Sequence, residues 1–89
     1  MNGVDVTRSA VQRAMSSCTE ASNELQNASK NLKRYYEAAG SGWKDSKYRE
    51  LGNIIIECNG AIVNPITQLN ECLKTLIELD KILEIYENA

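Results

Sequence analysis

Near the middle of the chain lies the segment Ala38-Ala39-Gly40-Ser41-Gly42-Trp43-Lys44-Asp45-Ser46. Gly40 is suited to end a helix, because the residue after a helix end often adopts a left-handed conformation, and Gly42 gives the turn further freedom. Asp45 or Ser46 can cap a following helix by accepting hydrogen bonds from its free backbone N–H groups. The segment therefore predicts a turn between two helices.

The residues before this turn follow a heptad pattern. One row, spaced by seven residues, contains Val4, Val11, Cys18, Leu25 and Leu32. A companion row contains Met15, Ser22, Ser29 and Tyr36. Rows at this spacing share one face of a helix, and the small side chains of Ser22 and Ser29 favour close approach of another helix.

The residues after the turn repeat the pattern with larger apolar side chains. One row contains Ile55, Ile62, Leu69, Leu76 and Leu83. The second row contains Leu51, Cys58, Cys72, Leu79 and Tyr86, with Pro65 in the intervening place. Further apolar residues at Ile54, Ile56, Ile66, Leu73 and Ile77 widen the face. A wide apolar face is typical of a helix that contacts more than one neighbour.

Pro65 conflicts with this second helix, because it removes a hydrogen bond to residue 61 and clashes with that carbonyl group. The heptad phase is the same on both sides of it, so we predict a kink near residues 60–65 and no break. Curvature along a partner and a hinge are the two alternatives, and we favour curvature.

Together these patterns predict an all-α fold with a single domain at 1–89. We expect an antiparallel helical hairpin with helices at about 5–39 and 46–87 and a turn at 40–45. Two helices cannot cover the wide second face, and burial of one Leu or Ile side chain contributes about 1.5–3 kcal/mol. We therefore predict dimerisation into a four-helix bundle, as a homodimer or a heterodimer with another hairpin. The predicted partner interface consists of Val11, Met15, Cys18, Leu25, Leu32, Ile55, Ile62, Leu69, Leu76 and Leu83.

The three cysteines, Cys18, Cys58 and Cys72, fall on these apolar rows. None belongs to a Cys-x-x-Cys motif, which argues against a redox pair or a zinc site. Because buried cysteine behaves as a small hydrophobe, we expect all three to be buried. Antiparallel pairing places Cys72 about 6 Å along the axis from the position opposite Cys18, so a bridge between them is conceivable but not expected.

The composition excludes most catalytic arrangements. The sequence contains no His, so it can build neither a nucleophile–His pair nor the Glu-x-x-His of a bundle metal site. The segment Gly40-Ser41-Gly42 lacks the strand and the Lys-Ser/Thr of a phosphate-binding loop. We expect no enzymatic activity, no cofactor and no metal.

Charge and hydropathy narrow the class of partner. The formal net charge is −2, whereas a nucleic-acid-binding domain usually carries a basic face. No apolar run approaches the roughly 20 residues of a membrane span, so we expect no stable membrane insertion. Met1 to Thr7 lack a charged segment followed by an apolar one, so we expect no conventional signal peptide.

Trp43 is the only tryptophan and lies in the predicted turn. It has two interpretations: the indole packs across the helix ends, which we favour, or it contacts a partner, since Trp is prominent among interface hot spots. With two amphipathic helices and this central Trp, the chain resembles the WXG family, the small early-secreted-antigen-like proteins of type VII secretion in Gram-positive bacteria and mycobacteria. The resemblance implies an antiparallel hairpin that dimerises and passes through an ATPase-driven membrane machine, some members being associated with virulence.

Two features differ from the family pattern. The family's Trp-x-Gly is here Trp43-Lys44-Asp45, and the Tyr-x-x-x-Asp/Glu export signal is not present, because Tyr86 is followed by three residues. The resemblance therefore leaves two alternatives: a substrate whose partner chain carries the signal, or a helper that targets the helical N-terminal region of an LXG-type toxin. It implies a cytoplasmic location before export. An intracellular coiled-coil adaptor unrelated to secretion is the competing hypothesis.

Overall fold

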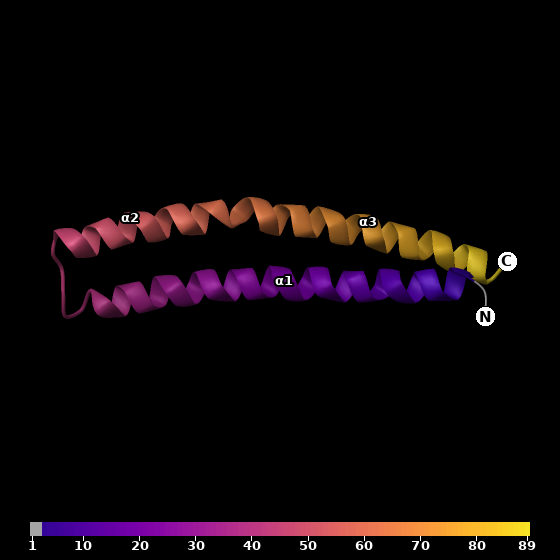
Figure 1. Ribbon diagram of the computed structural model, residues 1–89, viewed down its shortest axis with the longest axis horizontal. Coiled ribbons are helices and arrows are strands. Elements are labelled where there is room, and N and C mark those ends of the chain that lie inside the picture. Colours follow the sequence, from indigo (N-terminus) through magenta and orange to yellow (C-terminus); the bar gives the residue numbers. More distant parts are fainter. Residues whose placement is uncertain (1–2) are drawn as a thin grey trace.

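The computed structural model describes residues 3–89, and every element in that range is a helix (Figure 1). The helices are α1 (Gly3–Ala39), α2 (Ser46–Ala61) and α3 (Val63–Glu87). The predicted all-α class is confirmed.

The chain folds back on itself, so that α1 lies antiparallel beside α3 and, near the turn, beside α2 (Figure 1). Both ends of the described chain lie together, and the 40–45 connection lies at the far end (Figure 1). The molecule is a rod of 66 × 17 × 13 Å. A rod only two helices thick has little interior, and among residues 3–89 the buried apolar or aromatic side chains are those of Val11, Tyr48 and Ile55.

The apolar face of α1 lies toward α3, as its heptad pattern predicts. Val11 and Ser22 are buried, whereas Met15, Cys18 and Leu25 are half-buried. Leu32 departs from its row and is exposed.

One row of the second limb faces α1 as expected, but its companion row does not. Ile55 is buried, and Ile62, Leu69, Leu76 and Leu83 are half-buried. The companion residues that also turn toward α1 are Gly52, Asn59, Ile66, Leu73 and Asp80. We call these two rows together the inner face. The expectation that Leu51, Cys58, Cys72, Leu79 and Tyr86 share that face is wrong, because all five are exposed.

Polar contacts with α1 fix this choice of rows. Ser29 Oγ donates to Asn59 Oδ1 at 2.9 Å, and Arg8 Nε donates to Asp80 Oδ1 at 3.1 Å. Two paired helices meet through two rows of each helix, so these contacts leave the third apolar row of the second limb outside. Polar residues on the inner face are tolerated because α1 supplies their hydrogen-bond partners.

The predicted kink is present, but the second helix is also interrupted at Ile62. The backbone of Ile62 remains right-handed helical (φ −80°, ψ −13°), and its N–H is directed to the carbonyl groups of Cys58 and Gly60. Pro65 thereby falls in the first turn of α3, where a backbone N–H has no partner within the helix. The bend is visible as the arch of α2 and α3 over α1 (Figure 1).

Candidate protein-binding surface

The most prominent surface feature is a row of apolar side chains along α2 and α3 that α1 does not cover. We call it the outer row, and all its members are exposed: Leu51, Ile54, Cys58, Ala61, Pro65, Cys72, Leu79, Ile82 and Tyr86. Ile54 is 55% exposed, Ile82 49% and Tyr86 64%. Members recur every three or four residues, the spacing of a helix–helix contact row, except that the polar Gln68 and Thr75 occupy two of the intervening places. The outer row therefore repeats along the whole second limb and is not a scatter of isolated residues.

The outer row lies beside the inner face and not behind it. Outer-row residues that are seven positions apart each come directly before a residue of the inner face. Leu51 precedes Gly52, for example, and Cys58 precedes Asn59. One residue corresponds to about 100° around a helix axis. The second limb thus presents two apolar faces at roughly a right angle, one already packed and one open.

Three hollows of the rod open on one side, which we call the hollowed side. Its α1 members Asp5, Gln12, Thr19 and Lys33 are related by multiples of seven residues and line three separate hollows. Ile56 and Ile77 line the same hollows from the second limb. Side chains so spaced share one helix face.

The opposite side, which we call the flat side, carries the outer row. In an antiparallel pair, the residues that directly precede the inward positions of one helix lie on the same side of the pair as the residues that directly precede the inward positions of the other. The α1 residues on this side are therefore those that directly precede its inward positions. They are Thr7, Ala10, Ala14, Ser17, Ala21, Glu24, Ala28, Asn31, Tyr35 and Ala38. Ala14 and Ala21 are half-buried and the others are exposed. The flat side combines large apolar side chains of α2 and α3 with mostly small side chains of α1, among which Glu24, Asn31 and Tyr35 are the larger exceptions.

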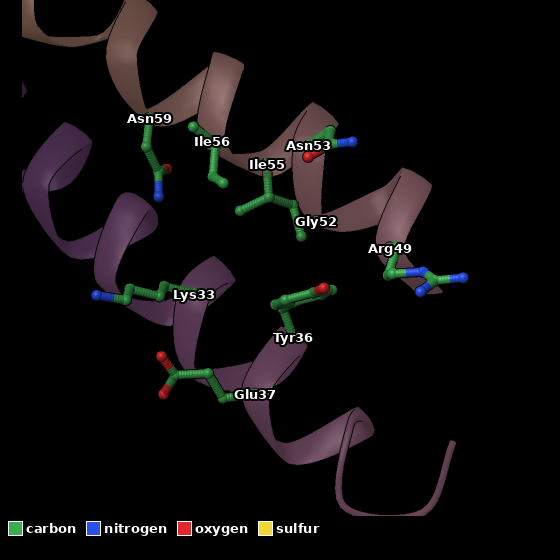
Figure 2. A pocket seen from close by; sticks show the side chains of 9 residues that line it. All are labelled: Lys33, Tyr36, Glu37, Arg49, Gly52, Asn53, Ile55, Ile56 and Asn59. Atoms are coloured by element: carbon green, nitrogen blue, oxygen red, sulfur yellow. The ribbon is translucent and has the colours of Figure 1, made fainter. Parts of the chain in front are cut away.

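A groove of about 550 Å³ opens on the hollowed side between α1 and α2 (Figure 2). Figure 2 shows Ile55 directed toward α1 and Tyr36 directed toward α2. The full lining consists of Lys33, Tyr36, Glu37, Arg49, Gly52, Asn53, Ile55, Ile56 and Asn59. The groove exists because small or polar side chains, Ser29, Gly52 and Asn59, occupy the space between the helices here. Its mixed charges and open walls supply no nucleophile paired with a base.

Two tyrosines join the helices at the turn end of the rod. The rings of Tyr36 and Tyr48 stack with centroids 4.2 Å apart and planes 6° from parallel. Tyr36 Oη donates to the Tyr48 carbonyl at 3.1 Å, and Tyr48 Oη donates to the Tyr36 carbonyl at 2.9 Å. Tyr48 is buried, and burial raises the pKa of its phenol.

Two glycines make this stacking possible. A Cβ atom at Gly40 would collide with the Tyr48 hydroxyl, and one at Gly52 would lie 2.8 Å from Tyr36 Cζ. The prediction that Gly40 ends α1 in a left-handed conformation is wrong, since no residue in the 3–89 range has a positive φ. Gly40 is needed for the close approach of a ring. Gly42 has no such neighbour.

Trp43 and Asp45 occupy the places in the turn that the sequence predicts. Asp45 is the N-cap of α2, and its carboxylate accepts from the Tyr48 N–H at 3.0 Å. This backbone hydrogen bond, helped by a side-chain hydrogen bond from Trp43, lowers the pKa of Asp45. The Trp43 indole meets the Tyr48 ring edge-on at 5.8 Å and remains 46% exposed. Trp43 therefore packs on the helix ends and still offers surface to a partner.

The open end of the rod is held by charge. Arg8 contacts Asp80, Glu84 and Glu87 of α3 at 3.1, 3.4 and 3.0 Å. Its hydrogen bonds to Glu87 and Asp80 raise the pKa of the guanidinium group. A cation shared among three carboxylates ties the start of α1 to the end of α3.

The cysteines are less buried than the sequence predicts. Cys18 is half-buried, and the pKa of its thiol is raised by desolvation and by a hydrogen bond with Cys72. Cys58 and Cys72 are exposed members of the outer row, so the expectation that all three are buried is wrong. All three are free thiols.

The structure thus places most residues of the predicted partner interface against the other limb of the same chain. Their role toward a partner stays a prediction. Sequence reasoning missed Tyr48 and Gly52, although a signal was present: Tyr-x-x-x-Gly occurs twice, at Tyr36–Gly40 and Tyr48–Gly52, on either side of the turn.

Within the described residues, no group of three or more cysteine or carboxylate side chains is placed to hold a metal ion. None of the helices in that part of the chain combines the length and the apolar character needed to cross a membrane. No protein-family model, curated protein or solved structure matches the chain.

Proposed function

We propose that this chain is a non-catalytic protein-binding module whose outer row docks on another helical hairpin to form a four-helix bundle. The observation that carries the proposal is the exposed, regularly spaced apolar row from Leu51 to Tyr86. Monomeric proteins rarely leave a long contiguous apolar surface in water, and such surfaces mark sites of association.

The angle between the two apolar faces supports a bundle over other assemblies. A helix in a four-helix bundle contacts two neighbours, and the second limb offers two faces about 100° apart. One face is filled by α1, so the other requires a helix from outside the chain. Several Leu and Ile side chains lie on it, and each contributes about 1.5–3 kcal/mol when it is fully buried.

We propose that the chain is not a catalyst because it lacks the side chains that most catalytic mechanisms require. The sequence lacks His, and the groove beside Tyr36 brings together Lys33, Glu37 and Arg49 without a nucleophile–base pair. General acid–base and covalent mechanisms need such pairs in hydrogen-bond reach. Apolar contact surface is therefore the chemistry this chain offers.

For the biological setting, we propose type VII secretion, with the chain acting as a WXG-like substrate or as the targeting partner of an LXG-type toxin. The helix–turn–helix layout and the half-exposed Trp43 in the turn support this proposal. In it, the chain is cytoplasmic before export and engages a secretion ATPase together with its partner.

The sequence also favours a second candidate, an intracellular coiled-coil adaptor unrelated to secretion. Its support is the replacement of Trp-x-Gly by Trp43-Lys44-Asp45. Deletion of the secretion ATPase in the native host separates the two: the chain or its bound toxin disappears from the medium if the secretion proposal holds, and neither is in the medium beforehand if the adaptor proposal holds.

The binding proposal is tested by light scattering on the purified chain, alone and mixed with candidate hairpin partners. The variant Leu79→Glu places a charge in the outer row, and Ile56→Glu places the same charge on the hollowed side, where Ile56 is 70% exposed. We expect Leu79→Glu to abolish association and Ile56→Glu to retain it. Equal behaviour of the two variants would contradict the outer row as the binding surface.

A further inference from the structure

We propose that the occupant of the flat side is a second copy of this chain, related by a two-fold axis along the length of the rod. The inference rests on the proposed function, because it names the partner and its orientation. In this arrangement α1 of each copy packs against α2 and α3 of the other. The two turns then lie at the same end of the dimer.

Contacts within one chain fix the height of each residue along the rod. Arg8 is level with Asp80 and Ser29 is level with Asn59, as their hydrogen bonds of 3.1 and 2.9 Å show. A two-fold axis parallel to the rod leaves heights unchanged and makes the contact isologous. Residues level within one chain are therefore level across the dimer contact.

Side-chain sizes complement each other at these heights. Leu79 of one copy lies level with Ala10 of the other, and Leu51 lies level with Ala38; all four residues are exposed. Between them, Ala14, Ala21 and Ala28 also face the outer row, together with the polar Glu24 and Asn31 and, near the turn, Tyr35. Large side chains opposite small ones let two helices approach to the usual 8–10 Å.

Charges complement each other along the border of this contact. One border residue directly precedes each of Leu51, Cys58, Pro65, Cys72, Leu79 and Tyr86. These border residues are mostly acidic: Glu50, Glu57, Asn64, Glu71, Glu78 and Ile85. The equivalent border of α1 carries Val6, Arg13, Glu20, Asn27 and Arg34. The like borders of two antiparallel helices adjoin each other, so these two sets face each other across the dimer.

The register brings opposite charges together. Arg13 lies within about one helical turn of Glu78 in the other copy, and Arg34 lies within the same distance of Glu57. The symmetry repeats each pair, which gives four favourable pairs. Glu20 opposite Glu71 is unfavourable and is also repeated, so the balance remains attractive.

The opposite orientation, with the turns at opposite ends, lacks this balance. It would stack the second limb on the second limb, so that the border of Glu57, Glu71 and Glu78 would face itself. Like charges in such positions disfavour pairing. Charge therefore selects the orientation with both turns together, and it selects a second copy because the borders of this chain complement each other.

The first test reverses the charges in the 89-residue chain and measures the dimer dissociation constant. We expect Arg13→Glu alone and Glu78→Arg alone to weaken the dimer about tenfold each, because two exposed ion pairs become like-charge contacts. The double variant should return to within about threefold of the unmodified chain. Lys33→Glu, on the hollowed side, is the matched control and should leave the constant unchanged. If the double variant weakens the dimer by as much as the two single variants combined, Arg13 and Glu78 are not in contact and the proposed arrangement is wrong.

The second test measures orientation directly. A spin label is placed at Gly42→Cys after the native cysteines are replaced by Ala, and light scattering confirms that this chain still dimerises. Labels at the same end should lie closer than half the 66 Å length of the rod. A separation near the full length would overturn the inferred orientation while the binding proposal stands. If the chain binds only a different hairpin, the inference that its partner is a second copy is wrong. If it binds no hairpin, the proposed function itself is wrong.

Discussion

The inner face and the outer row of the second limb are built from similar residues and have opposite fates. Ile55 is 7% exposed and its chain neighbour Ile54 is 55% exposed. The inner face also accepts Asn59 and Asp80, because α1 satisfies them with Ser29 and Arg8. The outer row, although it contains no charged residue, stays open. The difference teaches that the paired side of a helix is chosen by its complement across the contact and not by hydrophobicity alone.

The largest expected effect comes from removing a side chain from the inner face. Ile55→Ala should lower the free energy of unfolding by about 2–5 kcal/mol, the usual cost of a cavity at a buried Ile. Ile54→Ala should cost less than about 1 kcal/mol at low protein concentration, because a monomer leaves this side chain in water. Urea denaturation followed by circular dichroism measures both.

Protein concentration sharpens this pair of variants. Association stabilises the folded state by mass action, so the loss caused by Ile54→Ala should grow as the concentration rises, whereas the loss caused by Ile55→Ala should already be present in the monomer. Equal losses for both variants at every concentration would show that the two faces do not differ as described.

The next largest effect concerns Gly52 of the inner face, which leaves room for the Tyr36 ring near the turn. Gly52→Ala should lower the free energy of unfolding by about 1–3 kcal/mol, since the added methyl group collides with the Tyr36 ring and overpacks the contact. Gly60→Ala is the matched control, because nothing lies within 4 Å of its added Cβ atom. That variant should stabilise the helix by up to about 1 kcal/mol. Thermal melting that moves in the same direction for both would contradict the tyrosine–glycine contact.

Thiol reactivity compares the two faces without a substitution. Cys18 belongs to the inner contact, where desolvation raises the pKa of its thiol, and Cys58 belongs to the outer row. In dilute monomer at pH 8, Cys58 should react with a disulfide reagent about tenfold faster than Cys18, because the exposed thiolate is the attacking species. Mass spectrometry of peptides resolves the two rates, and protection of Cys58 at high concentration would report association.

The smallest expected effect is the pH dependence of the turn. Because the pKa of Asp45 is lowered, its cap stabilises the fold at pH values above 3.8, the ordinary pKa of an aspartate. The contribution is lost as the pH falls through the lower pKa of the folded state. Asp45→Asn keeps a cap without a titrating group, so its melting temperature should decline less steeply between pH 5 and pH 2. Parallel pH profiles would contradict the cap as the cause of the shift.

Much of the fold could be predicted from the sequence, because local rules determine it. The start of the second helix follows from the Asp45 cap, and the helices of residues 3–89 follow from the seven-residue periodicity. Pro65 correctly marked the bend, although the position of the interruption at Ile62 depends on local hydrogen bonding.

The choice of the inner face could not be predicted, because the second limb has three apolar rows and any two adjacent rows could meet α1. Asp80 is a poor core residue when judged alone, and only its contact with Arg8 from the other end of the chain explains its place. Glycine is likewise required at positions 40 and 52 because the tyrosine rings of the opposite helix leave no room for a Cβ atom there. Sequence patterns within a single helix therefore cannot predict these contacts, because each contact depends on a residue of the other helix.

The central claim, that the outer row is a binding surface, is tested most directly by sedimentation equilibrium of the unmodified chain beside Leu79→Glu. We predict twice the chain mass of 9.9 kDa for the unmodified chain and the single-chain mass for the variant. A single-chain mass for the unmodified protein throughout the micromolar range, alone and mixed with every candidate hairpin, would contradict the claim.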